Sequence, residues 1–124
     1  MSKEHVANPD VDSLLDAGEN YLREAEESLH RSEYDGVGET YFKAVAACLQ
    51  AACQRVGVEF GGKADYFHAM EELTARTGAD WAEKALSVAF ILHQNDERGF
   101  LSHDQIRRFG QDVRRLVRWL KTIG

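Results

Sequence analysis

Residues 102–121 read SHDQIRRFGQDVRRLVRWLK, and this stretch decides the fold class. Its apolar residues recur every three or four positions, the spacing that places side chains along one face of an α-helix. They are Ile106, Phe109, Val113, Leu116, Val117 and Leu120. Ser102, followed three positions later by Gln105, forms the capping box typical of a helix N-terminus. The stretch therefore predicts an amphipathic helix whose apolar face packs against other helices.

Helical spacing of apolar residues continues through the rest of the chain, and the single proline is Pro9. We expect four further helices: one over about 12–31, one that follows a turn at 32–38 and ends at 56, one over 64–77, and one capped by Asp80 that runs to Gly99. Long helices with short connections pack as antiparallel neighbours. The sequence predicts an all-α fold, an up-and-down four-helix bundle with an additional short helix. We expect a single domain over 12–124 after a flexible N-terminus at 1–11.

The composition is that of one globular domain. The chain has 124 residues, enough to bury a core, and none of its apolar runs approaches the ~18 to 20 residues of a membrane span. The N-terminus, MSKEHVANPDVD, lacks the apolar region and the cleavage site of a secretory signal. Cys48 and Cys53 point about 140° apart on a helical wheel, so they cannot pair within their helix. We expect both to be small buried apolar residues in a reducing compartment. We expect a cytoplasmic protein that makes no contact with membranes.

The charges are segregated along the chain. Residues 1–97 carry 8 Lys/Arg against 19 Asp/Glu, a net charge of −11, whereas residues 98–124 carry 7 against 2, a net charge of +5. Arg107, Arg114, Arg118 and Lys121, here called the basic rail, fall within about 60° of one another on the last predicted helix. The rail could follow a nucleic-acid backbone with salt-sensitive affinity. It could equally form ion pairs with the glutamates of the first predicted helix.

Arg98 and His103 form an Arg-x4-His pair across the turn that precedes the last predicted helix, within LHQNDERGFLSH at 92–103. A helix N-terminus favours phosphate, and a nearby guanidinium adds a bidentate contact. An imidazole at the same place could accept a proton from a ribose 2′-hydroxyl. Arg-His pairs with four to six intervening residues arise by chance about once in a chain of this composition, and Arg23 and His30, with six residues between them, form another. Location rather than spacing makes Arg98 and His103 the candidate catalytic pair.

Metal-binding patterns are weaker. His68 has helical spacing to Glu71 and Glu72, as His93 has to Glu97. The paired Glu-x-x-His motifs of di-iron bundles and the Cys/His clusters of zinc sites are missing from the sequence. A glycine-rich phosphate loop and a nucleophile elbow are missing too. We therefore expect neither a metal nor a cofactor.

Two longer segments carry a family pattern. Residues 17–53 read AGENYLREAEESLHRSEYDGVGETYFKAVAACLQAAC, and residues 79–102 read ADWAEKALSVAFILHQNDERGFLS. The first resembles the opening hairpin of the HEPN superfamily of small helical bundles, especially its archaeal PaREP-type branch. The second resembles that branch's WaeA…LHxNFYeGxLs pattern, and the resemblance extends over about residues 12–121. The matching positions are Trp81, Ala82, Ala85, Leu92, His93, Asn95, Gly99, Leu101 and Ser102.

The resemblance implies a homodimer and, as in many HEPN members, a metal-independent endoribonuclease of the toxin or defence type. It carries the Arg-x4-6-His motif onto Arg98 and His103, with His93 and Asn95 orienting the pair. It also implies RNA as the substrate and a nucleotidyltransferase-type antitoxin as a protein partner.

The sequence departs from the nuclease pattern at two positions. Gly99 replaces the polar residue that usually follows the arginine, and Gln105 replaces the tyrosine two places after the histidine in toxin-type members. The alternative hypothesis is a non-catalytic dimeric module that binds a nucleotide, a nucleic acid or a partner protein. Under either hypothesis, Trp81 and Trp119 fit the apolar helix faces, and we expect them to be core or dimer-interface anchors rather than ligand-stacking residues.

Overall fold

The computed structural model describes residues 10–60 and 65–123, and it contains five α-helices and no strand within those residues. The helices are α1 (Val11–His30), α2 (Val37–Val56), α3 (Tyr66–Thr77), α4 (Trp81–Arg98) and α5 (His103–Thr122). The predicted all-α class and the number of helices are confirmed. The predicted start of the third helix at 64 and most of the predicted N-terminal segment lie outside the described residues. Val11, the last residue of that predicted N-terminal segment, already belongs to α1.

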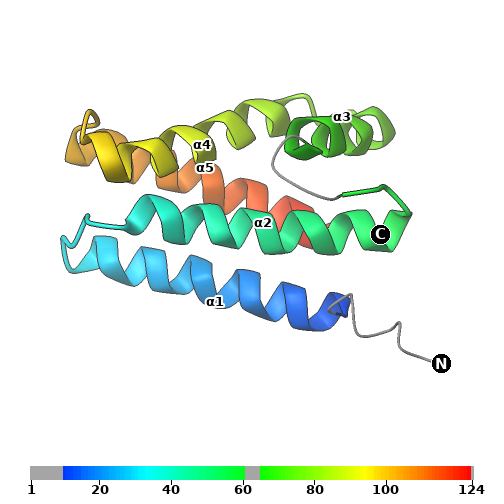
Figure 1. Ribbon diagram of the computed structural model, residues 1–124, viewed down its shortest axis with the longest axis horizontal. Coiled ribbons are helices and arrows are strands. Elements are labelled where there is room, and N and C mark those ends of the chain that lie inside the picture. The colour runs from blue at the N-terminus through cyan, green and yellow to red at the C-terminus, as the bar shows by residue number, and fades with distance from the viewer. Residues whose placement is uncertain (1–9, 61–64, 124) are drawn as a thin grey trace.

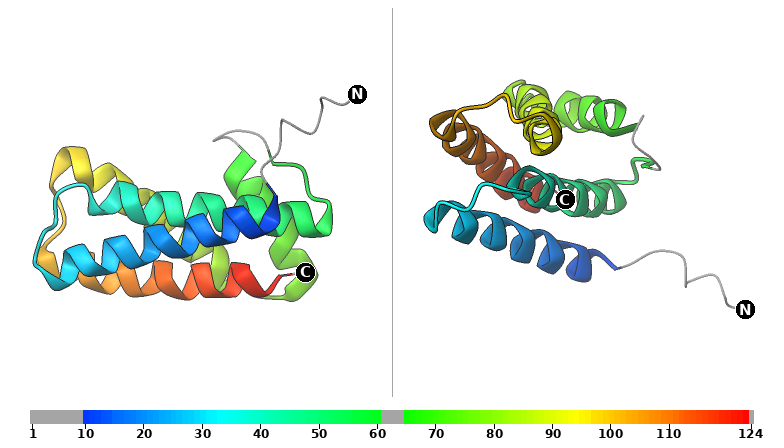
Figure 2. Two further views of the ribbon diagram at one scale, coloured as in Figure 1. Left: turned by 90° about the horizontal axis from the view of Figure 1, so that it is seen from below. Right: turned by 60° about the vertical axis from the view of Figure 1, so that its left-hand side comes forward.

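The four long helices run in alternating directions, as Figure 1 shows, and α3 packs beside them on α4 and α2. The central helix is α2, because it contacts each of the other four helices. The turn between α1 and α2 and the turn between α4 and α5 lie at the same end of the molecule (Figure 2). Residues of both turns can therefore contribute to one surface.

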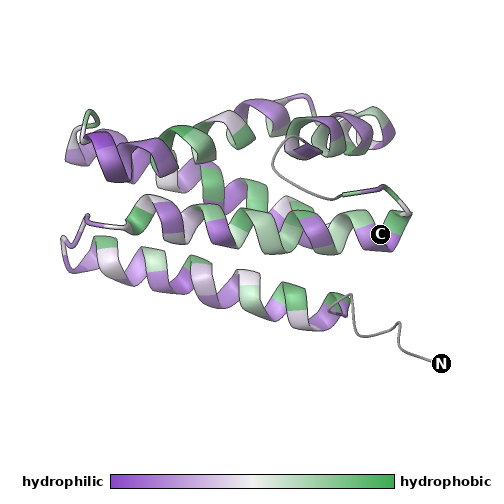
Figure 3. Cartoon of the chain, in the orientation of Figure 1, coloured by the Kyte–Doolittle hydropathy of each residue, from purple (hydrophilic) through white to green (hydrophobic). Residues whose placement is uncertain are grey.

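Small side chains explain why α2 can pack against so many neighbours. Ala44, Ala51 and Ala52 are almost completely buried, and apolar residues are concentrated along this helix (Figure 3). A side-chain carbon added at Gly38 would overlap the backbone carbonyl of Leu92, so α2 and α4 meet backbone to backbone there. The core is thus built around a helix with little side-chain bulk.

Local sequence signals account for the starts of α1 and α5. The Asp10 carboxylate accepts the Ser13 N–H at 2.8 Å and begins α1, and the capping box predicted at Ser102 is present. The cap predicted at Asp80 is wrong. Its backbone is already helical (φ −59°, ψ −30°), so the carboxylate cannot fold back onto the first turn, and it makes no capping hydrogen bond.

Both cysteines are buried in α2 and unpaired, as the helical wheel predicts. Burial raises the pKa of each thiol to about 11. Within the described residues, the helices are all too short or too polar to cross a bilayer.

Candidate functional site

Asn95 fixes the turn between α4 and α5. Asn95 is only 9% exposed, although it carries a polar amide side chain. The Asn95 Oδ1 accepts the Leu101 N–H at 2.7 Å, and its backbone carbonyl accepts the Gly99 N–H at 2.8 Å. Gly99 takes the left-handed conformation (φ 64°) that this tight ending requires. Asn95 therefore holds the backbone between the last residue of α4 and the first residue of α5.

Arg98 and His103 occupy those two positions. Arg98 is the last residue of α4, His103 is the first residue of α5, and both are exposed. The Ser102 Oγ accepts the Gln105 N–H at 3.1 Å, and the Gln105 Oε1 accepts the Ser102 N–H at 2.8 Å, so the start of α5 is well defined. Among the described residues, Arg98 and His103 share no hydrogen bond or ion pair. The turn places both on one edge of the molecule without joining them directly.

The imidazole of His103 is held by a residue of the other turn. Tyr34, between α1 and α2, stacks on His103 with the ring centroids 3.7 Å apart and the planes 9° from parallel. The Arg107 Nη2 donates to the Tyr34 hydroxyl at 2.7 Å and to the Leu29 carbonyl at 2.9 Å, at the end of α1. Tyr34 thus has a fixed position, and it presents a flat face on which the imidazole lies.

Asp96 makes a second contact at this end of the molecule, between α4 and α2. Its carboxylate accepts the backbone N–H of Gly38 at 3.0 Å and that of Glu39. The first turn of α2 has no side-chain cap of its own, because Gly36 stands at its N-cap position. A carboxylate is favoured at a helix N-terminus, so Asp96 on α4 supplies the missing cap. This contact ties the start of α2 to the end of α4.

His93 lies elsewhere. Its ring meets that of Phe42 edge-on, with the centroids 5.0 Å apart. Phe42 also contacts Tyr66 and Phe90, so His93 belongs to an aromatic group formed by α2, α3 and α4. His93 and Asn95 are the two residues predicted to orient Arg98 and His103. The structure places Asn95 at the turn between α4 and α5, but it places His93 in the aromatic group.

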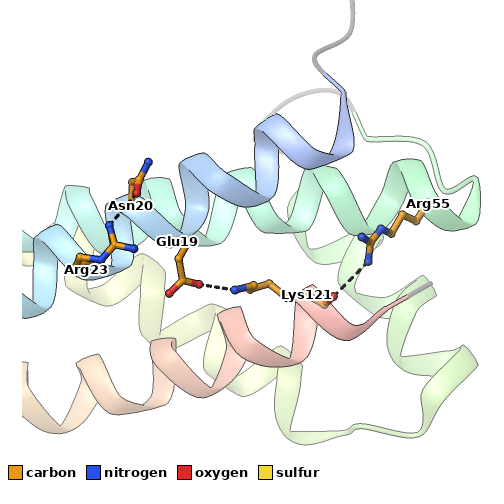
Figure 4. A network of polar contacts seen from close by, with 5 residues as sticks. All are labelled: Glu19, Asn20, Arg23, Arg55 and Lys121. Atoms are coloured by element: carbon orange, nitrogen blue, oxygen red, sulfur yellow. Dashed lines mark hydrogen bonds and ion pairs between the residues drawn. The ribbon is translucent and has the colours of Figure 1, made fainter.

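The basic rail lies along α1. Arg114 forms an ion pair with Glu26 at 3.4 Å. Lys121 hydrogen-bonds the carboxylate of Glu19 (Figure 4). That hydrogen bond lowers the pKa of the Glu19 carboxyl. Arg118 is exposed and lies close enough to Glu19 to lower that pKa further. Two of the four rail residues, Arg114 and Lys121, thus pair with glutamates of α1, which is the second of the two arrangements that the sequence allows, whereas Arg107 bonds the Leu29 carbonyl and Tyr34.

The sequence pattern around His68 that could hold a metal ion lies on the surface of the structure. His68 lies 4.0 Å from both Glu71 and Glu72, and all three side chains are exposed on α3. In the part of the chain that the structure describes, His, Cys, Asp and Glu side chains nowhere gather in a group of three or more suited to a metal ion.

Helical periodicity and motif spacing single out neither Tyr34 nor Asp96 at this end of the molecule. Both act through contacts that join distant segments, which helical periodicity cannot detect. For Tyr34 there was one usable signal, an aromatic residue within the polar turn RSEYDG at 31–36. For Asp96 there was none, because a carboxylate near the end of a helix is usually solvated.

Comparison with models of known protein families identifies a family for this chain. The model of the archaeal PaREP1/PaREP8 family matches residues 13–120, which is nearly the whole chain and includes both turns of the candidate site. A search of curated proteins found no match. The predicted resemblance to the PaREP-type branch is confirmed, and the chain belongs to the archaeal PaREP1/PaREP8 family.

Proposed function

We propose that this protein is a HEPN-like, metal-independent endoribonuclease whose site is formed at the turn between α4 and α5. The observation that carries the proposal is the placement of Arg98 and His103, both exposed, at the two ends of a turn that Asn95 fixes. Arg98 would bind the scissile phosphate through its guanidinium. His103 would take the proton of the ribose 2′-hydroxyl and return a proton to the leaving 5′-oxygen.

The stacking of His103 on Tyr34 supports this role for the imidazole. A general base has to hold its ring nitrogen in line with the hydroxyl that it deprotonates, and a flat aromatic contact restricts the ring. Tyr34→Phe keeps the stacking surface, whereas Tyr34→Leu removes it. We expect the phenylalanine variant to retain most of the cleavage rate and the leucine variant to lose at least tenfold. Equal cleavage rates for the two variants would show that the stacking of Tyr34 on His103 does not contribute to the reaction.

A homodimer would complete the site. Phe100 is 51% exposed and lies in the turn between Arg98 and His103, so a partner that packed on this turn would gain free energy by burying it. A second copy would cover it and place two Arg-His pairs in one cleft. Phe100→Ser should therefore lower both the dimer mass in light scattering and the cleavage rate. The matched control is Phe67→Ser, on α3, which is 42% exposed and should leave both unchanged.

Alanine variants of the pair test the proposal directly. We expect Arg98→Ala and His103→Ala each to abolish RNA cleavage with little change in thermal stability, because both side chains are exposed. Arg23→Ala and His68→Ala are matched controls, since both residues are exposed on other helices and should not affect cleavage. Full activity in Arg98→Ala or His103→Ala would contradict the proposal.

The alternative is a non-catalytic dimeric module that binds a nucleotide, a nucleic acid or a partner such as a nucleotidyltransferase. One observation favours it: the Gln105 side chain, where toxin-type members have tyrosine, is engaged in the capping box of α5. The discriminating result is RNA binding without cleavage in the wild type. Binding that weakens steeply with salt would then assign the exposed arginines of α5 to phosphate contacts.

A further inference from the structure

A second polar surface lies apart from the Arg98–His103 turn. A groove of about 360 Å³ lies between α1 and α5, and Tyr41 of α2 also lines it. The residues that matter for its chemistry are Tyr41, Arg107, Gly110, Gln111, Arg114 and Glu26. The α5 residues Gly110, Gln111 and Arg114 follow Arg107 by three, four and seven positions, so all four share one face of that helix.

The hydroxyl of Tyr41 opens onto this groove. Tyr41 is 1% exposed, and its hydroxyl forms no hydrogen bond with any described residue. Every fully buried side-chain nitrogen or oxygen in the described chain does have a partner, so this hydroxyl must reach the groove. A side-chain carbon at Gly110 would lie 2.5 Å from it, and the glycine leaves that space free. A buried tyrosine whose hydroxyl meets only the groove is arranged as a donor for something bound there.

That donor stays protonated. Burial, and then the negative charge of Glu26, raise the pKa of Tyr41 far above its ordinary value. The hydroxyl can therefore donate a hydrogen bond throughout the physiological pH range.

Two guanidinium groups flank the hydroxyl with unused donors. Arg107 uses its Nη2 on α1 and on Tyr34, which leaves Nε and Nη1 without a partner among the described residues. Arg114 approaches Glu26 through Nε, which leaves both of its Nη atoms. Two positive charges face one carboxylate, so the groove keeps an excess of positive charge. Arginine N–H groups match the oxygens of a phosphate, and the volume can hold a phosphate with an attached sugar.

We propose that this groove binds a phosphate group, with the Tyr41 hydroxyl and the free N–H groups of Arg107 and Arg114 as donors. The phosphate comes from a free mononucleotide or from an RNA backbone. The site does not depend on the nuclease proposal, because neither Arg98 nor His103 lines the groove.

Calorimetric titration at low salt tests the site with three probes: inorganic phosphate, AMP and a short oligoribonucleotide. We expect Tyr41→Phe to lower the affinity at least tenfold while the melting temperature stays equal or rises, because no hydrogen bond within the protein is lost. Arg114→Gln should weaken binding similarly. Arg76→Gln, an exposed arginine on α3 that does not line the groove, is the control and should retain nearly full affinity.

The probes distinguish the source of the phosphate. Saturable binding of AMP that Tyr41→Phe abolishes would identify a nucleotide site, and much tighter binding of the oligoribonucleotide with the same loss would identify a backbone site. Either result supports the proposal. It is overturned if none of the three probes binds, if Tyr41→Phe binds like the wild type, or if Tyr41→Phe melts several degrees lower.

Discussion

Replacing Asn95 with alanine should destabilise the turn between α4 and α5 by a measurable amount. The substitution leaves the Leu101 N–H, now bonded at 2.7 Å, without its acceptor in a partly buried place. The loss of such a hydrogen bond costs about 1–3 kcal/mol. An unfolding entropy of about 2.1 cal/mol/K per residue gives this chain of 124 residues roughly 0.26 kcal/mol/K. The melting temperature should therefore fall by about 4–12 °C.

Thermal unfolding followed by circular dichroism measures this shift. The control is Gln94→Ala, since Gln94 is the exposed neighbour on the same helix and should change the melting temperature by no more than about 2 °C. Because Asn95 also holds the backbone between Arg98 and His103, any RNA cleavage should fall with the same substitution. An Asn95→Ala variant that melts like the wild type would refute the structural role given to this side chain.

Two further predictions concern the core. Gly38→Ala should destabilise the fold by about 1–3 kcal/mol or more in denaturant titration, because the added carbon meets the backbone of Leu92 and α4 must move away. A stability equal to that of the wild type would contradict the backbone contact. Cys48 and Cys53, whose burial raises both pKa values from 9.0 to about 11, should resist iodoacetamide at pH 8 until the protein is unfolded. Because both pKa values are higher in the folded than in the unfolded state, the thiols should not change the free energy of unfolding below about pH 9 and should lower it as the pH rises towards 11. Rapid iodoacetamide labelling of the folded protein at pH 8 would contradict the burial of the two thiols.

Features encoded within one helix could be predicted from the sequence. The apolar stripe of α5 and the capping box at Ser102 depend on residues three or four positions apart, and both are present. The central position of α2 follows from its alanines, because small side chains allow close approach from several sides. Asp80 shows the limit of local rules, since a residue type suited to capping can still lie inside the helical turn.

Contacts between distant segments could not be predicted in the same way. Asp96 accepts the N–H of Gly38, which is 58 positions away in the sequence, and periodicity carries no information about that distance. The stacking of Tyr34 on His103 depends on two turns meeting at one end of the molecule. The basic rail was ambiguous for a similar reason, since an arginine stripe has the same sequence pattern whether it faces solvent or a glutamate such as Glu26.

The most direct test of the proposed function is an end-group analysis of RNA incubated with the pure wild-type protein in EDTA. In the proposed reaction the 2′-hydroxyl attacks the phosphate, so we predict cleavage that EDTA does not inhibit. The products should carry 2′,3′-cyclic phosphate and 5′-hydroxyl ends, and His103→Ala should form none of them. Intact RNA after incubation with the wild-type protein, or fragments with 3′-hydroxyl and 5′-phosphate ends, would contradict the assignment of Arg98 and His103 as a metal-independent ribonuclease site.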